Sequence, residues 1–131
     1  MFKLKLLIEK LYHRDIHLPK EVEPYVGRVY RLLYTAHAQS AAKTDRYGKI
    51  DLSKVDKMMK VDLKDVVEAE IDDVAGDVTK LVIRKPYDEQ FDIVIAFTPN
   101  IRSNEGTVRT VWLNRKSDVH KTLRTGAYTE K

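Results

Sequence analysis

The sequence has no cysteine, and it has only four prolines and five glycines in 131 residues. The missing thiols exclude disulfide bonds and thiolate metal sites, which is compatible with a reducing cytoplasm. Long apolar runs are missing too. Glu9 and Lys10 directly follow the apolar run at residues 1–8, so this run is too short for a signal peptide or a bilayer span. We therefore expect a soluble cytoplasmic protein without a membrane partner.

Length and composition predict one domain, residues 1–131. A hydrophobic fraction of 43% and a charged fraction of 34% are typical of a chain that folds around a core. The length suffices for one such core. Neither an internal repeat nor a long linker divides the chain. Because no nucleotide- or metal-binding fingerprint is found, we expect no cofactor.

Charge is unevenly distributed along the chain. Residues 1–50 hold ten lysines and arginines against five acids, residues 51–77 hold four against nine, and residues 102–131 hold seven against three. Two basic segments that flank an acidic one can form a single basic face, as in polyanion-binding proteins. Ordinary solvated surfaces would give the same counts. An acidic patch beside a basic one also suits a protein partner.

The first half of the chain has a helical pattern. Apolar residues recur at three- and four-residue steps from residue 19 to a stop at Gly48, and this spacing predicts one long helix. A short helix is expected near residues 51–59, after the capping residue Asp51. The first element, within residues 2–11, is ambiguous because strand alternation and helical spacing are both present.

The second half alternates with the period of β-strands. Strands are predicted at residues 67–71, 78–85, 91–97 and 107–115, with a turn at residues 75–77. A meander of four strands after helices indicates an antiparallel sheet. The predicted fold class is therefore α+β, with two or three N-terminal helices packed on one face of a four-stranded antiparallel sheet.

The richest cluster of polar side chains lies near the C-terminal end of the sequence. Arg109 is in the last predicted strand, and His120, Lys121, Thr122 and Arg124 follow it. Cleavage of RNA through its 2′-hydroxyl group needs a base, an acid and fixed positive charge for the developing phosphorane. Histidine suits the first two roles near neutral pH, and lysine and arginine suit the third. A solvated basic tail is the simpler interpretation of the same residues.

Two cations on an earlier strand extend this pattern. Lys80 and Arg84 have the spacing of residues on one side of a strand. With Arg109 they would form an anion site on the face away from the helices. Mid-strand arginines also protect sheet edges from aggregation, which is their commoner role. His37, late in the long predicted helix, is a further candidate for proton transfer, although a surface histidine would fit the same position.

These elements and residues resemble the barnase–EndoU–colicin–RelE group of small ribonucleases, which includes RelE-type toxins and RegB-type phage endoribonucleases. The resemblance covers roughly residues 30–128. It depends on the order of the elements, on a His-Ala pair at residues 37–38, and on the terminal segments Thr110-Val111-Trp112-Leu113-Asn114 and Asp118-Val119-His120-Lys121-Thr122-Leu123. Small phage proteins share this ending.

The resemblance implies a metal-independent endoribonuclease, or a toxin-like protein that binds RNA and associates with the ribosome. The residues implied in catalysis are His37, His120, Lys121 and Thr122, and those implied in binding RNA phosphates are Lys80, Arg84, Arg109 and Arg124.

Two other interpretations bear on function. The acids within residues 68–77 and Lys80 lack the acid–x–lysine unit of metal-dependent nucleases, so no metal site is predicted. The second is a non-catalytic phage-type protein that uses the same scaffold to bind a host protein or the ribosome. Its candidate surface is the acidic segment, residues 65–77.

Overall fold

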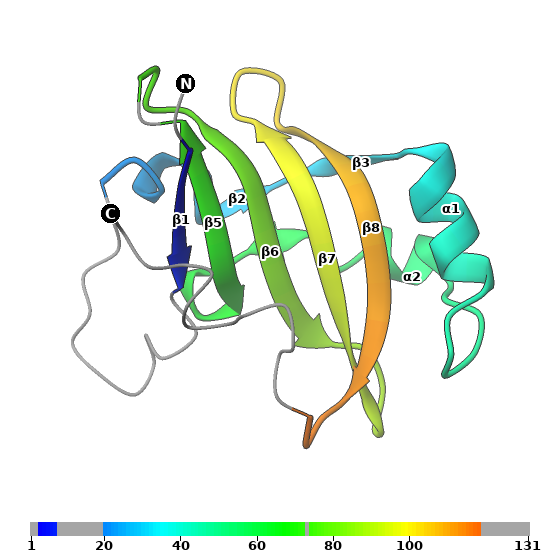
Figure 1. Ribbon diagram of the computed structural model, residues 1–131. Helices are drawn as coiled ribbons and strands as arrows, with labels where there is room; N and C mark the ends of the chain where they lie inside the picture. The colour runs from blue at the N-terminus through cyan, green and yellow to red at the C-terminus, as the bar shows by residue number, and fades with distance from the viewer. Residues whose placement is uncertain (1–2, 8–19, 73, 119–131) are drawn as a thin grey trace.

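The computed structural model describes residues 3–7, 20–72 and 74–118. A six-stranded sheet in the order β1-β5-β6-β7-β8-β3 forms the centre of this part of the chain (Figure 1). Its neighbouring strands are antiparallel, except that β3 runs parallel to β8. A separate two-stranded ribbon pairs β2 with β4.

Nearly all of the described chain belongs to these sheets, two α-helices and the turns between them. The strands of the large sheet are β1 (Lys3–Leu7), β5 (Val66–Asp72), β6 (Val78–Pro86), β7 (Phe91–Asn100), β8 (Glu105–Arg115) and β3 (Arg31–Tyr34). The other elements are β2 (Arg28–Val29), β4 (Lys60–Val61), α1 (Ala36–Lys43), α2 (Leu52–Asp56) and two 3₁₀ turns, Glu23–Tyr25 and Leu63–Asp65.

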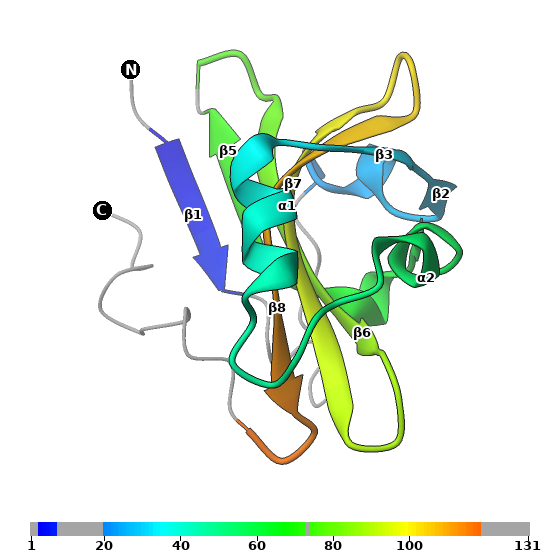
Figure 2. The ribbon, with the colours of Figure 1, turned by 90° about the vertical axis from the view of Figure 1, so that its right-hand side faces the viewer.

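The predicted fold class is wrong. The four predicted strands are present as the meander β5–β8, but β1 and the parallel strand β3 extend the sheet to six. The described residues contain only two α-helices, of eight and five residues, so this part of the chain is mostly β. Figure 2 shows α1 along the β8 edge and α2 with β2 on one side of the sheet. Neither described helix is long and apolar enough to cross a membrane.

The long helix predicted over residues 19–48 is the main error. Gly27 has a φ of 76°, a left-handed conformation that interrupts helical geometry. Beyond it the chain is extended, and it pairs first with β4 and then with β8. Tyr30 is buried in this stretch, with its ring edge-on to Phe97 at 5.3 Å between centroids. Pairing and burial of the aromatic side chains therefore override the helical spacing.

Both α-helices begin at capping residues. Thr35 precedes α1, and its side-chain oxygen accepts a hydrogen bond from the amide of Ala38 at 3.0 Å. Asp51 precedes α2, as predicted, and its carboxylate accepts from the amide of Ser53 at 3.0 Å. These bonds satisfy amides that the first helical turn leaves without partners.

The large sheet has two different faces. The core face packs against α1, α2 and the segment that contains β2, and it is almost wholly apolar. The mixed face combines a small apolar cluster with charged side chains. The strand residues of the core face are Val66, Ala69, Ile71, Val78, Leu81, Ile83, Ile93, Ile95, Phe97, Val108, Val111 and Leu113. The apolar residues of the mixed face are Val67, Val82, Val94, Ala96 and Trp112.

A β-bulge in β8 decides which of its residues share a face. Ala96 pairs with Thr110 while Phe97 pairs with Val108, so Arg109 is the extra residue. Val108 therefore lies in the core, and not on the side of Trp112 as simple alternation predicts.

Candidate functional site

A cleft of about 450 Å³ lies between α1 and the edge of β8. It exists because β3 pairs with β8 only through residues 105–108, after which the chain turns away into α1. The rest of the β8 edge thus faces a helix and not a strand. We call this feature the α1–β8 cleft. It is lined by Ala41, Thr44, Asp45, Arg46, Thr110, Val111, Trp112, Leu113 and Asn114.

Hydrogen bonds at both ends of α1 hold the helix beside β8. At its start, the amide of Thr35 donates to the carbonyl of Val108 at 3.2 Å, and the Thr35 hydroxyl donates to the carbonyl of Arg109 at 3.4 Å. After its end, Asp45 accepts from the amides of Leu113 at 3.1 Å and Tyr47 at 3.0 Å. The Asp45 carboxylate thus caps one donor of the β8 edge and fixes the width of the cleft.

His37 is exposed in the first turn of α1. Residues three and four apart lie on one side of a helix, so His37 shares a side with Ala41 and Thr44. Those two residues line the α1–β8 cleft. His37 therefore lies on the cleft side of α1, two residues after the bond between Thr35 and Arg109. An exposed imidazole in this place can exchange a proton with a molecule in the cleft.

Arg109, the bulged residue of β8, lies near this end of the cleft. Its Nε atom donates to the hydroxyl of Thr98 at 3.3 Å, and its side chain is exposed. Within the described ranges no acid forms an ion pair with Arg109. The bond from Thr35 to the Arg109 carbonyl places the start of α1, which carries His37, beside the backbone of Arg109. The guanidinium is available to an anionic ligand.

Sequence reasoning missed Asn114 and Arg46. Asn114 is only 4% exposed, and its Nδ2 atom has no hydrogen-bond partner among the described residues. An unpaired buried amide costs roughly 1–3 kcal/mol, and Asn114 is one of the residues that line the cleft. Arg46 lies over the ring of Tyr47, 4.7 Å from its centroid. The sequence signal for Asn114 is a polar amide on the same side of the strand as Trp112.

Arg84 has three partners within the protein. Its Nε atom lies 2.9 Å from the Oδ2 atom of Asp92. Its two terminal nitrogens donate to the carbonyls of Asp118 and Arg115, each at 2.9 Å. These bonds connect β6, across β7, to the end of β8. A phosphate at Arg84 would compete with all three, so the described contacts give this arginine a structural role.

Lys80 also has an acidic partner. Its Nζ atom is 3.2 Å from the Oε1 atom of Glu68, which is 1% exposed. The other oxygen of Glu68 has no hydrogen-bond partner in the described part of the chain. Lys80 and Arg84 do point to the same side of the sheet, away from the core face, as predicted. Both are held there by carboxylates.

Most of the described acids of the acidic segment, residues 65–77, are buried, and Asp77 is exposed. Asp65, Glu68, Glu70 and Asp72 are all buried. Asp65 pairs with Lys85 at 2.7 Å, and the other buried acids lie on β5. The described residues contain no group of three or more histidine, aspartate or glutamate side chains placed to hold a metal ion. These four carboxylates therefore contribute to the interior of the described fold.

The predicted residues His120, Lys121, Thr122 and Arg124 lie outside the described residues. Within the described residues, the lining of the α1–β8 cleft combines Arg46, an indole and a buried amide, and His37 and Arg109 lie on the two elements that border it. The cations suit phosphates, and the indole suits stacking on a base. Comparisons with models of protein families, with curated proteins and with solved structures give no significant match, so no family is shown for this chain.

Proposed function

We propose that the protein is a cytoplasmic, metal-independent endoribonuclease that binds RNA in the α1–β8 cleft. The observation that carries this proposal is that His37 and Arg109 lie on the two elements that border the cleft, where Thr35 bonds to the Arg109 carbonyl, and that Trp112 and Asn114 line the cleft itself. A proton-transfer group and a fixed cation are two of the elements that RNA cleavage through the 2′-hydroxyl needs, and a stacking surface suits the binding of a base.

The proposed reaction is an in-line transfer within the RNA. Neutral His37 takes the proton of the 2′-hydroxyl, and the 2′-oxygen attacks the adjacent phosphorus. The bond from phosphorus to the 5′-oxygen breaks, which leaves a 2′,3′-cyclic phosphate and a 5′-hydroxyl. Arg109 neutralises the non-bridging oxygens of the phosphorane. We assign the protonation of the leaving oxygen to His120, the second histidine that the resemblance implies in catalysis.

Incubation of the protein with RNA in EDTA tests the proposal. We expect products with 2′,3′-cyclic phosphate ends, and no cleavage of DNA of the same sequence, because DNA lacks the 2′-hydroxyl. His37→Ala should lower the rate by about 10²–10⁴-fold, the usual contribution of a general base. Arg102→Ala, an exposed arginine in the β7–β8 turn, is the matched control and should cleave normally. RNA that stays intact, with and without ribosomes, would contradict the proposal.

One observation favours a non-catalytic alternative, in which the protein binds a host protein or the ribosome. Val29 and Leu33 are 66% and 42% exposed on one side of the β2–β3 stretch, and exposed apolar pairs suit a protein partner. In that case His37→Ala would leave activity in cells unchanged, and Val29→Ser combined with Leu33→Ser would abolish it. Loss of activity in His37→Ala, with activity retained in the Val29–Leu33 double variant, supports cleavage.

A further inference from the structure

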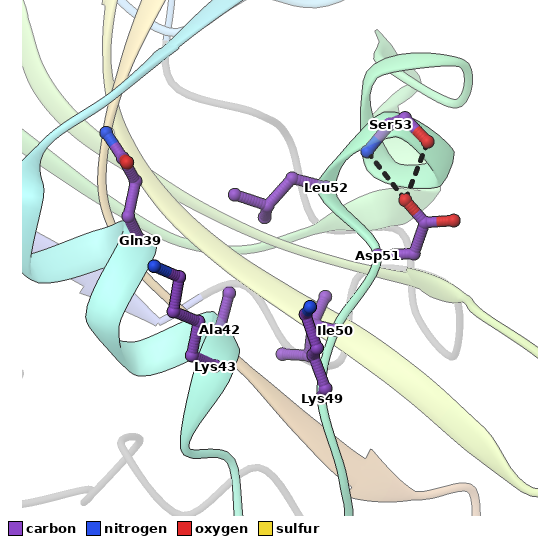
Figure 3. Close-up of a pocket in the computed structure, with 8 residues that line it drawn as sticks. All are labelled: Gln39, Ala42, Lys43, Lys49, Ile50, Asp51, Leu52 and Ser53. Atoms are coloured by element: carbon purple, nitrogen blue, oxygen red, sulfur yellow. Dashed lines mark hydrogen bonds between the residues drawn. The ribbon is translucent and has the colours of Figure 1, made fainter.

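A second cleft lies on the opposite side of α1. It has a volume of about 560 Å³ and separates α1 from the segment that leads into α2. Helical spacing places Gln39 and Lys43 on the side of α1 that faces this segment, away from Ala41 and Thr44. We call it the α1–α2 cleft. It is lined by Gln39, Ala42, Lys43, Lys49, Ile50, Asp51, Leu52 and Ser53 (Figure 3).

Two lysines stand on facing walls of this cleft. Lys43 comes from α1 and Lys49 from the opposite segment, with Ala42 and Ile50 between them (Figure 3). Neither ammonium group has an ion-pair partner among residues 20–72 and 74–118. Two unpaired cations across a small cleft repel each other, and an anion placed between them removes that repulsion. A phosphate group has the charge and the acceptor oxygens for both lysines.

The other residues that line the α1–α2 cleft favour a ligand that carries more than a phosphate group. Leu52 is half-buried and offers apolar surface to a flat ring or a sugar, and the buried Ile50 also lines the cleft. The Asp51 carboxylate accepts hydrogen bonds from the amide and the hydroxyl of Ser53. These bonds hold the pKa of Asp51 below its ordinary value, so the group stays an acceptor at neutral pH. A ligand that carries a phosphate, an apolar ring and hydroxyl donors matches these walls.

We propose that the α1–α2 cleft is a nucleotide-binding subsite. The phosphate lies between Lys43 and Lys49, the base or ribose packs on Ile50 and Leu52, and a ribose hydroxyl donates to Asp51. The inference rests on the proposed function in one respect, namely that the nucleotide belongs to the RNA strand bound beside it. The end of α1 separates the two clefts, so one strand that crosses this helix end can occupy both.

Titration of ¹⁵N-labelled protein with adenosine 5′-monophosphate, adenosine and inorganic phosphate tests the subsite by NMR. Adenosine 5′-monophosphate should shift the amides of residues 42–43 and 49–53 with saturation. Phosphate should shift the same amides more weakly, and adenosine should not. Lys43→Ala combined with Lys49→Ala should weaken nucleotide binding about tenfold or more, since hydrogen bonds to charged groups are lost. Lys20→Ala combined with Lys64→Ala, two exposed lysines elsewhere, should bind normally.

The outcomes separate this inference from the proposed nuclease. Equal nucleotide binding by the two double variants, or no shift of these amides, overturns the subsite. RNA cleavage with an unchanged KM in the Lys43–Lys49 double variant also overturns it and leaves the nuclease proposal intact. Saturable binding of the nucleotide in this cleft, in a protein that leaves RNA intact, supports the subsite and overturns the nuclease.

Discussion

The core face and the mixed face of the large sheet belong to the same strands, yet different interactions stabilise them. Along β6, Leu81 and Ile83 point into the core, while Lys80 and Arg84 point to the other side. The core face gains from burial of apolar area, which needs no particular partner. The mixed face depends on directional pairs, such as Arg84 with Asp92. The comparison teaches that one strand can be stabilised by packing on one side and by charge pairing on the other.

The two faces also differ in how completely their polar groups are satisfied. The ionisable strand residues on the core-face side have partners: Lys85 pairs with Asp65, and Arg115 lies over the ring of Tyr47. The two buried polar atoms without hydrogen-bond partners in the described chain, Glu68 Oε2 and Asn114 Nδ2, belong to side chains on the mixed face. An unpaired buried polar group lowers the stability of the fold, so its presence calls for an explanation such as a role in function. The mixed face and the β8 edge beside it are therefore the side of the sheet where function is expected.

The largest effect should follow from opening a cavity in the core face. Phe97 is fully buried and contacts Tyr30 and Gly106, where an added Cβ would lie 2.7 Å from the Phe97 ring. Phe97→Ala should lower the free energy of unfolding by about 3–5 kcal/mol, measured by urea denaturation. Phe97→Leu is the milder control. A loss below about 1 kcal/mol would mean that the site collapses around the smaller side chain.

Removal of a charge pair from the mixed face should have the next largest effect. Arg84→Ala removes one donor from Asp92, which keeps Lys116, and one from each of the carbonyls of Arg115 and Asp118. We expect a loss of about 2–3 kcal/mol in the same denaturation experiment, since bonds to a charged group are lost. Arg102→Ala should stay within about 0.5 kcal/mol of the native value, as is usual for an exposed side chain. Equal free energies of unfolding for the two variants would contradict the structural role assigned to Arg84.

Alkaline pH should destabilise the core face through its buried phenol. Burial raises the pKa of Tyr30 from 10.0 to about 12. Between these values the unfolded chain loses the proton and the folded chain keeps it, so stability is present below pH 10 and is lost as the pH rises towards 12. At pH 11 the loss is about 1 kcal/mol. Tyr30→Phe should show a smaller drop from pH 9 to pH 11 in thermal unfolding, and an unchanged drop would contradict the assignment.

The smallest effect on stability is expected at Asn114. Asn114→Leu removes the unpaired amide, so the free energy of unfolding should change by less than about 1 kcal/mol. RNA cleavage should fall in the same variant, because the cleft loses a donor. A large loss of stability with unchanged activity would instead identify the amide as a structural group.

The sequence predicted the meander β5–β8 because alternation within each strand is a local signal. It failed at residues 28–34, where Leu32 and Leu33 are adjacent and the pairing partners lie far along the chain. Strand alternation also predicted the wrong face of the sheet for Val108, because the β-bulge at Arg109 has no signal in the residue types around it. His37 and Arg109 were predicted as site residues, whereas Asn114 and Arg46 were missed.

The sequence by itself determined the absence of disulfides, the strand periods of β5–β8 and the cap Asp51, since each depends on residue type or on near neighbours. Only the tertiary structure decided that residues 31–34 join the sheet in parallel to β8. That pairing positions α1 beside the β8 edge and so forms the α1–β8 cleft. The physical reason is that strand pairing and ion pairs between distant segments are set by the free energy of the whole fold, which no local pattern contains.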